Sequence, residues 1–94
     1  MSLLVRPADP AEAADLQRLV RVTSLPPVDA EYVGSRHVFV AHEGNQLAGF
    51  FALHAGPSAW RLEHLWVAEA SVGRGRGRWL FTDAVRRARR LGAE

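Results

Sequence analysis

The chain has 94 residues, enough for one small domain, and a hydrophobic fraction of 48% that is ordinary for a globular protein. It contains no cysteine, which excludes disulfides and cysteine-based metal sites, and no apolar stretch approaches the length of a membrane span. From this composition we expect a soluble, cytoplasmic protein. The net charge is +2, and the basic residues cluster in the last quarter of the chain, which predicts an anionic partner there.

The first third of the sequence predicts a strand, a helix and a loop. Residues 3–6 form a short strand candidate. The run Asp9-Pro10-Ala11-Glu12 is typical of a helix start, because Asp9 suits the N-cap and Glu12 suits the capping-box position three residues later. The residues that recur at the spacing of one buried helix face are Leu16, Leu19, Val20 and Thr23. Two prolines should then end the helix, so residues 24–35 are predicted to be a loop that has room for a helical turn.

Three strands joined by short turns are predicted next. Residues 37–42 and 46–54 are rich in β-branched and aromatic side chains, and Glu43-Gly44-Asn45 between them is typical of a hairpin turn. A second turn at 55–58 leads to a third strand over residues 59–67. Strands connected in this way form an antiparallel meander.

The C-terminal segment predicts a helix from about Arg76 to Leu91. Its apolar stripe consists of Leu80, Ala84, Ala88 and Leu91. Gly92 suits the position just after a helix end. The sequence has no repeat and no low-complexity linker, so we expect one domain over residues 1–94. The element order β-α-β-β-β-α predicts an α/β (α+β) fold in which two helices flank the antiparallel sheet.

A glycine- and arginine-rich run, Val72-Gly73-Arg74-Gly75-Arg76-Gly77-Arg78, separates the last strand from the last helix. Alternating glycines allow the backbone to approach a ligand closely. The first turn of the helix offers unpaired N–H groups and the positive end of its dipole, and the arginines add charge. The run therefore predicts a seat for a phosphate or pyrophosphate. The common nucleotide motifs do not fit, because the chain has no lysine and lacks the third glycine of G-x-G-x-x-G.

In its order and spacing the sequence resembles the GNAT superfamily of acyl-CoA N-acyltransferases, over nearly the whole chain. Residues 4–9 (Leu-Val-Arg-Pro-Ala-Asp) look like the first strand of the family and its lead into the first helix. Residues 63–67 (Glu-His-Leu-Trp-Val) look like its fourth strand. The phosphate loop of the family is written Q/R-x-x-G-x-G/A, and its glycine positions are occupied here by Gly75 and Gly77.

The resemblance implies an acyl-CoA site, with acetyl-CoA as the default co-substrate. The position that carries Gln or Arg in the family is Val72 here, a departure that implies weaker pyrophosphate recognition and that Arg74 partly offsets. The backbone of the fourth strand would contact the acyl-pantetheine, and the loop would hold the pyrophosphate. The residues expected to bind the cofactor are Leu65, Trp66, Val67, Val72, Gly73, Arg74, Gly75, Arg76, Gly77 and Arg78.

By the same resemblance, the reaction is direct attack of an amine on a thioester, which a general base on the fourth strand assists. Glu63 is the candidate catalytic base. Alternation along a strand predicts that Glu63, Leu65 and Val67 share one face, while His64 points to the other as a packed histidine. The alternative for Glu63 is a solvated carboxylate paired with Arg61 or another arginine. No spacing of histidines and carboxylates predicts a metal site.

A complete domain of the family continues with a fifth strand, a fourth helix and usually two more strands, which the sequence does not contain. Its single tyrosine, Tyr32, is not at the position of the family's general acid. Because an open sheet edge invites pairing, we expect a homo-oligomer (a dimer) or a complementing chain. The expected function is acyl transfer from acyl-CoA to an amine by such an assembly or by a longer enzyme of which this is a fragment. The alternative is an inactive module that binds acyl-CoA or a partner protein.

Nucleic-acid binding is the weakest alternative. Arg-Gly runs contact phosphates, but this chain has few aromatic residues placed to stack on bases. The arginines of residues 86–90 are interpreted as a solvated helix face. The amine acceptor is not readable from the sequence, because it is set by residues 24–35 and by elements beyond the last helix.

Overall fold

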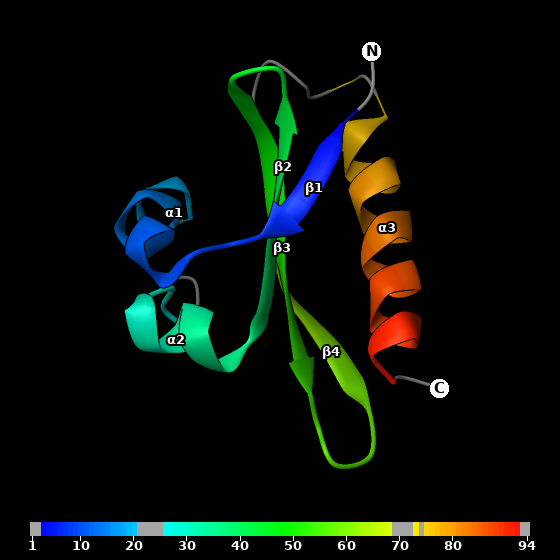
Figure 1. The fold of residues 1–94 in the computed structure, drawn as a ribbon. Coiled ribbons are helices and arrows are strands. Elements are labelled where there is room, and N and C mark those ends of the chain that lie inside the picture. Colours follow the sequence, from blue (N-terminus) through cyan, green and yellow to red (C-terminus); the bar gives the residue numbers. More distant parts are fainter. Residues whose placement is uncertain (1–2, 21–25, 69–72, 74, 93–94) are drawn as a thin grey trace.

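The computed structural model describes residues 3–20, 26–68, 73 and 75–92. Within these residues the chain forms a mixed α/β fold, a four-stranded antiparallel sheet with helices on both of its faces (Figure 1). The elements in chain order are β1 (Leu4–Pro7), the 3-10 helix η1 (Pro10–Glu12), α1 (Ala13–Leu19), α2 (Ala30–Ser35), β2 (His37–Glu43), β3 (Gln46–Ala55), β4 (Trp60–Val67) and α3 (Arg76–Leu91).

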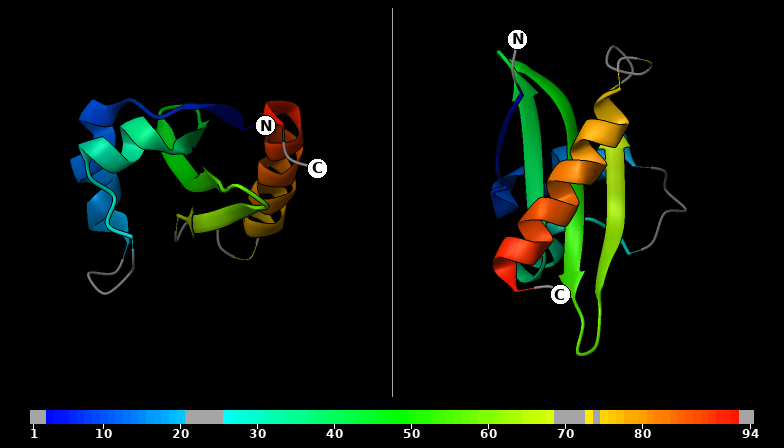
Figure 2. Two further views of the ribbon diagram at one scale, coloured as in Figure 1. Left: turned by 90° about the horizontal axis from the view of Figure 1, so that it is seen from below. Right: turned by 90° about the vertical axis from the view of Figure 1, so that its right-hand side faces the viewer.

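The strands lie in the order β1-β2-β3-β4, so each pairs with its neighbour in the chain. The side views place α1 and α2 on one face of the sheet and α3 along the other (Figure 2). The predicted meander and the predicted bounds of the last helix, Arg76 to Leu91, are confirmed. No helix among the described residues is long and apolar enough to cross a membrane.

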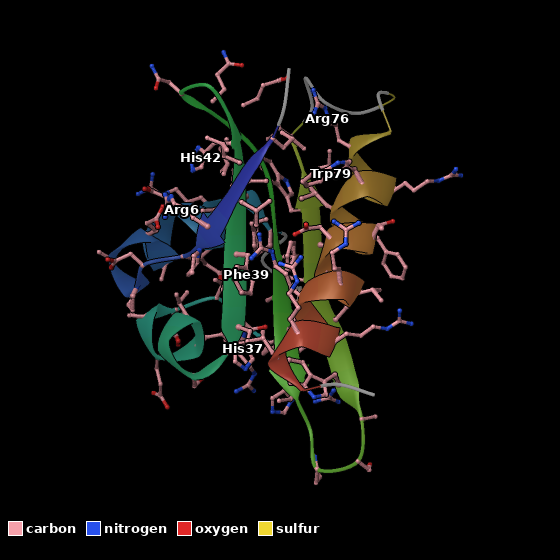
Figure 3. The ribbon with its side chains drawn as sticks, turned by 45° about the vertical axis from the view of Figure 1, so that its right-hand side comes forward. Arg6, His37, Phe39, His42, Arg76 and Trp79 are labelled. Carbon is pink, nitrogen blue, oxygen red and sulfur yellow. The ribbon has the colours of Figure 1, made fainter. Side chains whose placement is uncertain are left out.

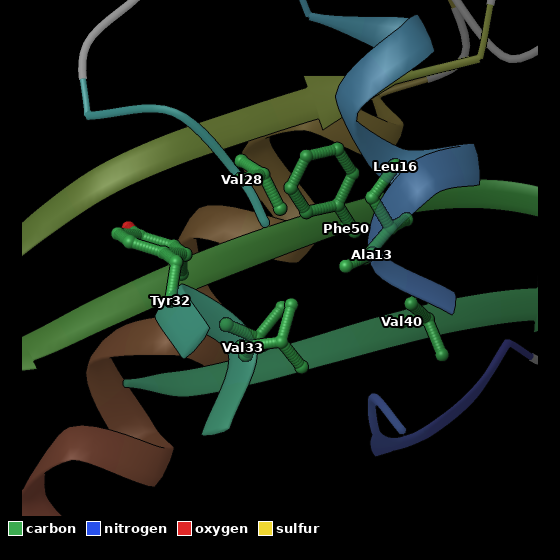
Figure 4. Close-up of a cluster of buried hydrophobic side chains, with 9 residues drawn as sticks. Ala13, Leu16, Val28, Tyr32, Val33, Val40 and Phe50 are labelled. Carbon is green, nitrogen blue, oxygen red and sulfur yellow. The ribbon is translucent and has the colours of Figure 1, made fainter. Parts of the chain in front are cut away.

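Alternation along β2 and β3 divides the core into two clusters, as the period of a strand requires. On the face of α1 and α2, Val38, Val40 and Phe50 pack against helix residues such as Leu16 (Figure 4). On the opposite face the cluster joins strand residues to α3 and consists of Phe39, Ala41, Phe51, Leu53, Leu80, Ala84 and Ala88. The sheet is therefore covered on both faces, and a separate hydrophobic cluster joins it to the helices on each face.

The first helix begins as the sequence predicts. Asp9 accepts a hydrogen bond from the N–H of Ala11 at 2.8 Å, and the Asp9 N–H donates to Oε1 of Glu12 at 2.9 Å, which completes a capping box. Leu16 is buried, at 2% exposed, and Leu19 and Val20 are partly buried. The helix nevertheless ends earlier than predicted, at Leu19, because Val20 has extended backbone angles, φ −91° and ψ 157°. Thr23 lies outside the described residues.

Two expectations about the helices differ from the structure. The predicted loop contains α2, whose N-cap Asp29 accepts from the N–H of Tyr32 at 2.8 Å. Val28 and Val33, which flank this cap, are both buried in one cluster, so a hydrophobic staple holds the short helix. In α3, Leu91 is 46% exposed although it continues the periodic stripe, because the buried cluster on that face ends at Ala88.

Candidate functional site

The phosphate seat predicted from the glycine-rich run lies at the N-terminal end of α3. Gly73 and Gly75 have φ of +86° and +75°, which glycine adopts without steric cost. Gly75 is the N-cap of α3, and its carbonyl accepts from the N–H of Trp79 at 3.0 Å. The N–H groups of residues 76–78 therefore precede the first helical hydrogen bond, and the N-cap has no side chain to satisfy them. Donors that have no hydrogen-bond partner among the described residues, at the positive end of a 16-residue helix, suit an anion.

The arginines of this run do not share one role. Arg76 lies at the start of α3 (Figure 3). It donates from Nη2 to Oε2 of Glu43 at 2.7 Å, so its charge is paired with the end of β2. Arg78 is exposed and lines an open pocket of about 300 Å³ that begins at Gly75. Val72 and Arg74, two further predicted contacts, lie outside the described residues. Of the two predicted cations that the structure describes, Arg78 has no ion-pair partner within the described part of the chain, whereas Arg76 is neutralised by Glu43.

The end of β4 adjoins the phosphate seat. A Cβ placed on Gly77 would lie 3.6 Å from Cγ2 of Val67, so the last strand residue touches the first turn of α3. Trp66 faces the other side of the sheet, where its ring lies 6.2 Å from that of Phe50. Leu65 is 39% exposed. Of the predicted strand and loop contacts, the structure therefore brings Val67 and Gly77 together, whereas Trp66 lies on the opposite face.

Glu63 lies in a β-bulge, which corrects the predicted alternation along β4. Ala52 of β3 is opposite His64, but the next residue, Leu53, is opposite Leu62. Glu63 is the extra residue of β4 at this point. A bulge interrupts the period of two, so Glu63 and His64 both face the α2 side, where both meet Tyr32. The expectation that they point to opposite faces is wrong. The expectation that Glu63 shares a face with Leu65 and Val67 is wrong as well, because Val67 packs on the α3 side, as does Phe51, which is opposite Leu65.

The carboxylate of Glu63 is surrounded by donors and cations. Its side chain is 8% exposed, and Oε1 accepts from the hydroxyl of Tyr32 at 2.7 Å and from Nε of Arg36 at 3.1 Å. The second oxygen, Oε2, accepts a longer hydrogen bond from Nη2 of Arg61 at 3.4 Å and lies 3.6 Å from Nδ1 of His54. The pairing with arginines matches the alternative interpretation of Glu63, but the carboxylate is buried rather than solvated.

These contacts set the ionisation of the pair. Burial pushes the pKa of Glu63 upward, but the hydrogen bonds from Tyr32 and Arg36 and the nearby positive charge outweigh it and hold the pKa below its usual range. For Tyr32, burial and the hydrogen bond to Glu63 raise the pKa of the phenol. At neutral pH the site therefore contains an ionised Glu63 carboxylate and a neutral Tyr32 hydroxyl that donates to it.

His64 is a packed histidine, as predicted. It is 7% exposed, its Nε2 lies 2.7 Å from the carbonyl oxygen of Pro26, and its ring meets that of Tyr32 edge-on at 5.7 Å. Sequence reasoning missed Tyr32 because residues 24–35 were interpreted as a loop. The signal that predicts its position is the N-cap Asp29 followed three residues later by an aromatic side chain.

The model of the acetyltransferase (GNAT) family matches residues 9–94, and the chain belongs to this family. The fold and the family expected from the sequence are thereby confirmed. No curated protein matches the sequence at a significant level.

Solved structures show the same fold. An IAA acetyltransferase from Bacillus cereus is 25% identical with a TM-score of 0.78, and the match covers 98% of this chain and 61% of that one. N-acetylglutamate synthase from Neisseria gonorrhoeae, complexed with coenzyme A and N-acetyl-glutamate, is 16% identical with a TM-score of 0.80, covering 99% and 24%. A GNAT family acetyltransferase from Brucella melitensis in complex with acetyl-CoA is 22% identical with a TM-score of 0.71, covering 98% and 71%. The chain thus spans about three-fifths of the Bacillus cereus protein.

Proposed function

We propose that this chain binds acyl-CoA, with acetyl-CoA as the default, and that it transfers the acyl group to an amine. The observation that carries the proposal is the uncapped N-terminus of α3 behind two glycines of positive φ. A Cβ added at Gly73 or Gly75 would meet nothing within 4 Å, so the backbone there is open to a pyrophosphate. These residues fit the phosphates of coenzyme A, which solved structures of the same fold contain.

The acyl-pantetheine would extend from this seat along β4. Leu65, Trp66 and Val67 would contact it through their backbone, and Gly73 to Arg78 would hold the pyrophosphate. Glu63 lies four residues before Val67, about 13 Å along an extended strand. That spacing leaves room for the arm of the co-substrate between the phosphate seat and the carboxylate.

We assign Glu63 the role of general base. The amine nitrogen would attack the thioester carbonyl carbon, the carbon–sulfur bond would break, and the coenzyme would leave as its thiol after taking up a proton. Glu63 would accept the proton that the amine loses, through Oε2 or through a water, because Oε1 accepts two hydrogen bonds, from Tyr32 and Arg36, whereas Oε2 accepts one longer bond of 3.4 Å from Arg61. Its lowered pKa keeps it ionised at neutral pH while making it a weak base.

The activity is proposed to need a homodimer partner, a complementing chain or the C-terminal half found in longer relatives. The last strand of the described sheet, β4, pairs with β3 along one side, and its other side is the edge of that sheet. Such an edge accepts a further strand. The proposed location of the protein is the cytoplasm.

The second candidate function is an inactive module that binds acyl-CoA or a partner protein. The ion pair between Arg76 and Glu43 favours it, because it removes one cation from the seat. The presence of valine at position 72, where the family carries Gln or Arg, points the same way. Turnover distinguishes the acyltransferase from the inactive module. Binding of acyl-CoA does not, because an inactive module could bind it as well.

Calorimetric titration of acetyl-CoA into the full chain tests the seat. We expect a micromolar Kd that rises with salt, because phosphate contacts are screened. Arg78→Gln should raise the Kd about fivefold to tenfold, the effect of one charge-assisted hydrogen bond. Arg18→Gln is the matched control, since this substitution removes the same charge from α1, on the other face of the sheet. Absence of binding at millimolar ligand would refute the proposal.

Turnover is then measured with a panel of amines. Glu63→Gln should lower kcat about 100-fold, the usual contribution of a general base, and leave the Kd of acetyl-CoA unchanged. Gln keeps an oxygen that accepts from Tyr32 and Arg36, so the fold should be retained. Binding without turnover on any amine would favour the inactive module.

A further inference from the structure

Two donors from α2 and its C-cap meet at one carboxylate oxygen of β4. Tyr32 comes from α2, Arg36 follows that helix directly, and Glu63 comes from the bulge in β4. Both Tyr32 and Arg36 donate to Oε1 of Glu63, at 2.7 and 3.1 Å. The guanidinium of Arg36 also lies over the ring of Tyr32, 5.1 Å from its centroid. The two donors therefore support each other while they bind the carboxylate.

Tyr32 is itself held from several directions. It is 6% exposed, and its backbone N–H donates to the side chain of Asp29. Its ring meets His64 edge-on, and His64 is fixed by the carbonyl of Pro26 at 2.7 Å. The hydroxyl of Tyr32 thus has little freedom to leave Glu63, because any rotation disturbs the packing of α2 on β4.

We propose that Tyr32 and Arg36 are positioning residues that saturate Oε1 of Glu63 and leave Oε2 as the oxygen that takes the proton. The proposal rests on the proposed function through the role of Glu63 as base. Among the described residues, the groups facing the carboxylate are Tyr32 and Arg36 from the α2 side, His54 from β3 and Arg61 from β4. Oε2 accepts only the 3.4 Å hydrogen bond from Arg61, whose side chain is 68% exposed, and the side chain of His54 beside it is 31% exposed. Oε2 is therefore the less tightly bound oxygen and lies on the more open side.

Two variants separate the effect of these hydrogen bonds on Glu63 from the effect of side-chain packing. Tyr32→Phe keeps the ring that contacts His64 and Arg36 and removes only the hydroxyl donor. Because that donor favours the ionised carboxylate, its loss should raise the pKa of Glu63. Arg36→Lys is the second variant, since it keeps a positive charge but lacks the planar group that lies over the ring of Tyr32.

Carbon-13 NMR of the glutamate carboxyl groups in the full chain measures this coupling. The Glu63 resonance is assigned by its loss in Glu63→Gln, and its titration midpoint is compared in wild type, Tyr32→Phe and Arg36→Lys. We expect the midpoint to rise in both variants, with a larger kcat loss, about tenfold or more, in Tyr32→Phe. Glu12, which accepts a hydrogen bond from Arg6, is the internal control, and its titration midpoint should be the same in all three proteins.

The rate profile completes the test. In Tyr32→Phe the acid limb of kcat should move to higher pH together with the Glu63 midpoint, while the KM for acetyl-CoA stays unchanged. An unchanged midpoint in a folded Tyr32→Phe protein overturns the proposal, as does a raised midpoint with an unmoved acid limb. Failure of the proposed function has a different signature, the absence of acetyl-CoA binding by wild type in calorimetry.

Discussion

Arg76 and Glu43 form an ion pair that joins the first turn of α3 to the end of β2, with Nη2 2.7 Å from Oε2. Their side chains are 17% and 16% exposed, so the pair is largely shielded from water. It fixes the N-terminus of α3 against the β2–β3 hairpin and at the same time neutralises a cation beside the phosphate seat. The ion pair therefore makes the phosphate seat more rigid but reduces its positive charge.

Replacing Glu43 with Gln should separate these two effects. Loss of a hydrogen bond between charged groups should lower the free energy of unfolding by about 1–3 kcal/mol. Arg76 then becomes an unpaired cation next to the seat, so the Kd of acetyl-CoA should fall at low salt. Urea unfolding and calorimetry measure the two quantities. Arg76→Gln is the control, which should lose stability without tighter binding. Unchanged stability in Glu43→Gln would show that the pair contributes nothing in solution.

Gly49 permits the close approach of α3 to the sheet. A Cβ at this position would lie 2.5 Å from Cδ1 of Leu80 and 2.5 Å from the backbone oxygen of Trp66. We expect Gly49→Ala to destabilise the fold by about 1–3 kcal/mol, because a backbone atom cannot yield as a side chain can. Gly77→Ala is the matched control, since its Cβ would make ordinary contact, and it should stabilise α3 by up to about 1 kcal/mol. Equal urea midpoints for the two variants would contradict this account.

Gly75 is required for its backbone conformation rather than for space. Its φ is +75°, and an added Cβ would touch nothing within 4 Å. Gly75→Ala should therefore cost about 1–2 kcal/mol, the penalty of a left-handed residue with a Cβ. Asn tolerates this region better, so Gly75→Asn should recover part of the loss. Gly34→Ala in α2, also in open space but in a helix, should instead be neutral or stabilising, and thermal unfolding distinguishes the two.

The contact between Arg6 and Glu12 should make stability depend on pH in the acid range. Two hydrogen bonds of 2.8 Å from Arg6 lower the pKa of Glu12 from 4.5 to about 2. A carboxyl whose pKa is lower in the folded state contributes its full stability above the unfolded pKa and loses it as pH falls through the folded pKa. The contribution is therefore complete above about pH 4.5 and disappears toward pH 2.

Glu12→Gln tests this dependence while keeping the capping oxygen. Because the side chain of Arg6 is 48% exposed, the loss at pH 7 should be at most about 1 kcal/mol. The difference from wild type should shrink steadily as the pH approaches 2, in urea titrations at several pH values. A difference that is constant with pH would mean that Glu12 acts through the cap alone.

Elements with strong local signals were predictable from the sequence. Asp9 and Glu12 specify a helix start by themselves, and Gly44 with Asn45 specifies a hairpin, because a few neighbouring residues determine each structure. The helix from Arg76 to Leu91 follows from its periodicity and from Gly92. By contrast, α2 has only six residues, and its stability depends on burial of Tyr32 and Val33 against the sheet.

The sequence by itself determined the meander, the long C-terminal helix and the glycines of the phosphate seat, since turn chemistry, periodicity and conformational freedom are local properties. Only the tertiary structure decided how the charged side chains are used. The bulge at Glu63 depends on how β4 pairs with β3, and it places Glu63 beside Tyr32 and Arg36. Arg76 is paired because the β2–β3 hairpin brings Glu43 to α3. Such contacts join residues about 30 positions apart, and their distances follow from packing, which no local pattern encodes.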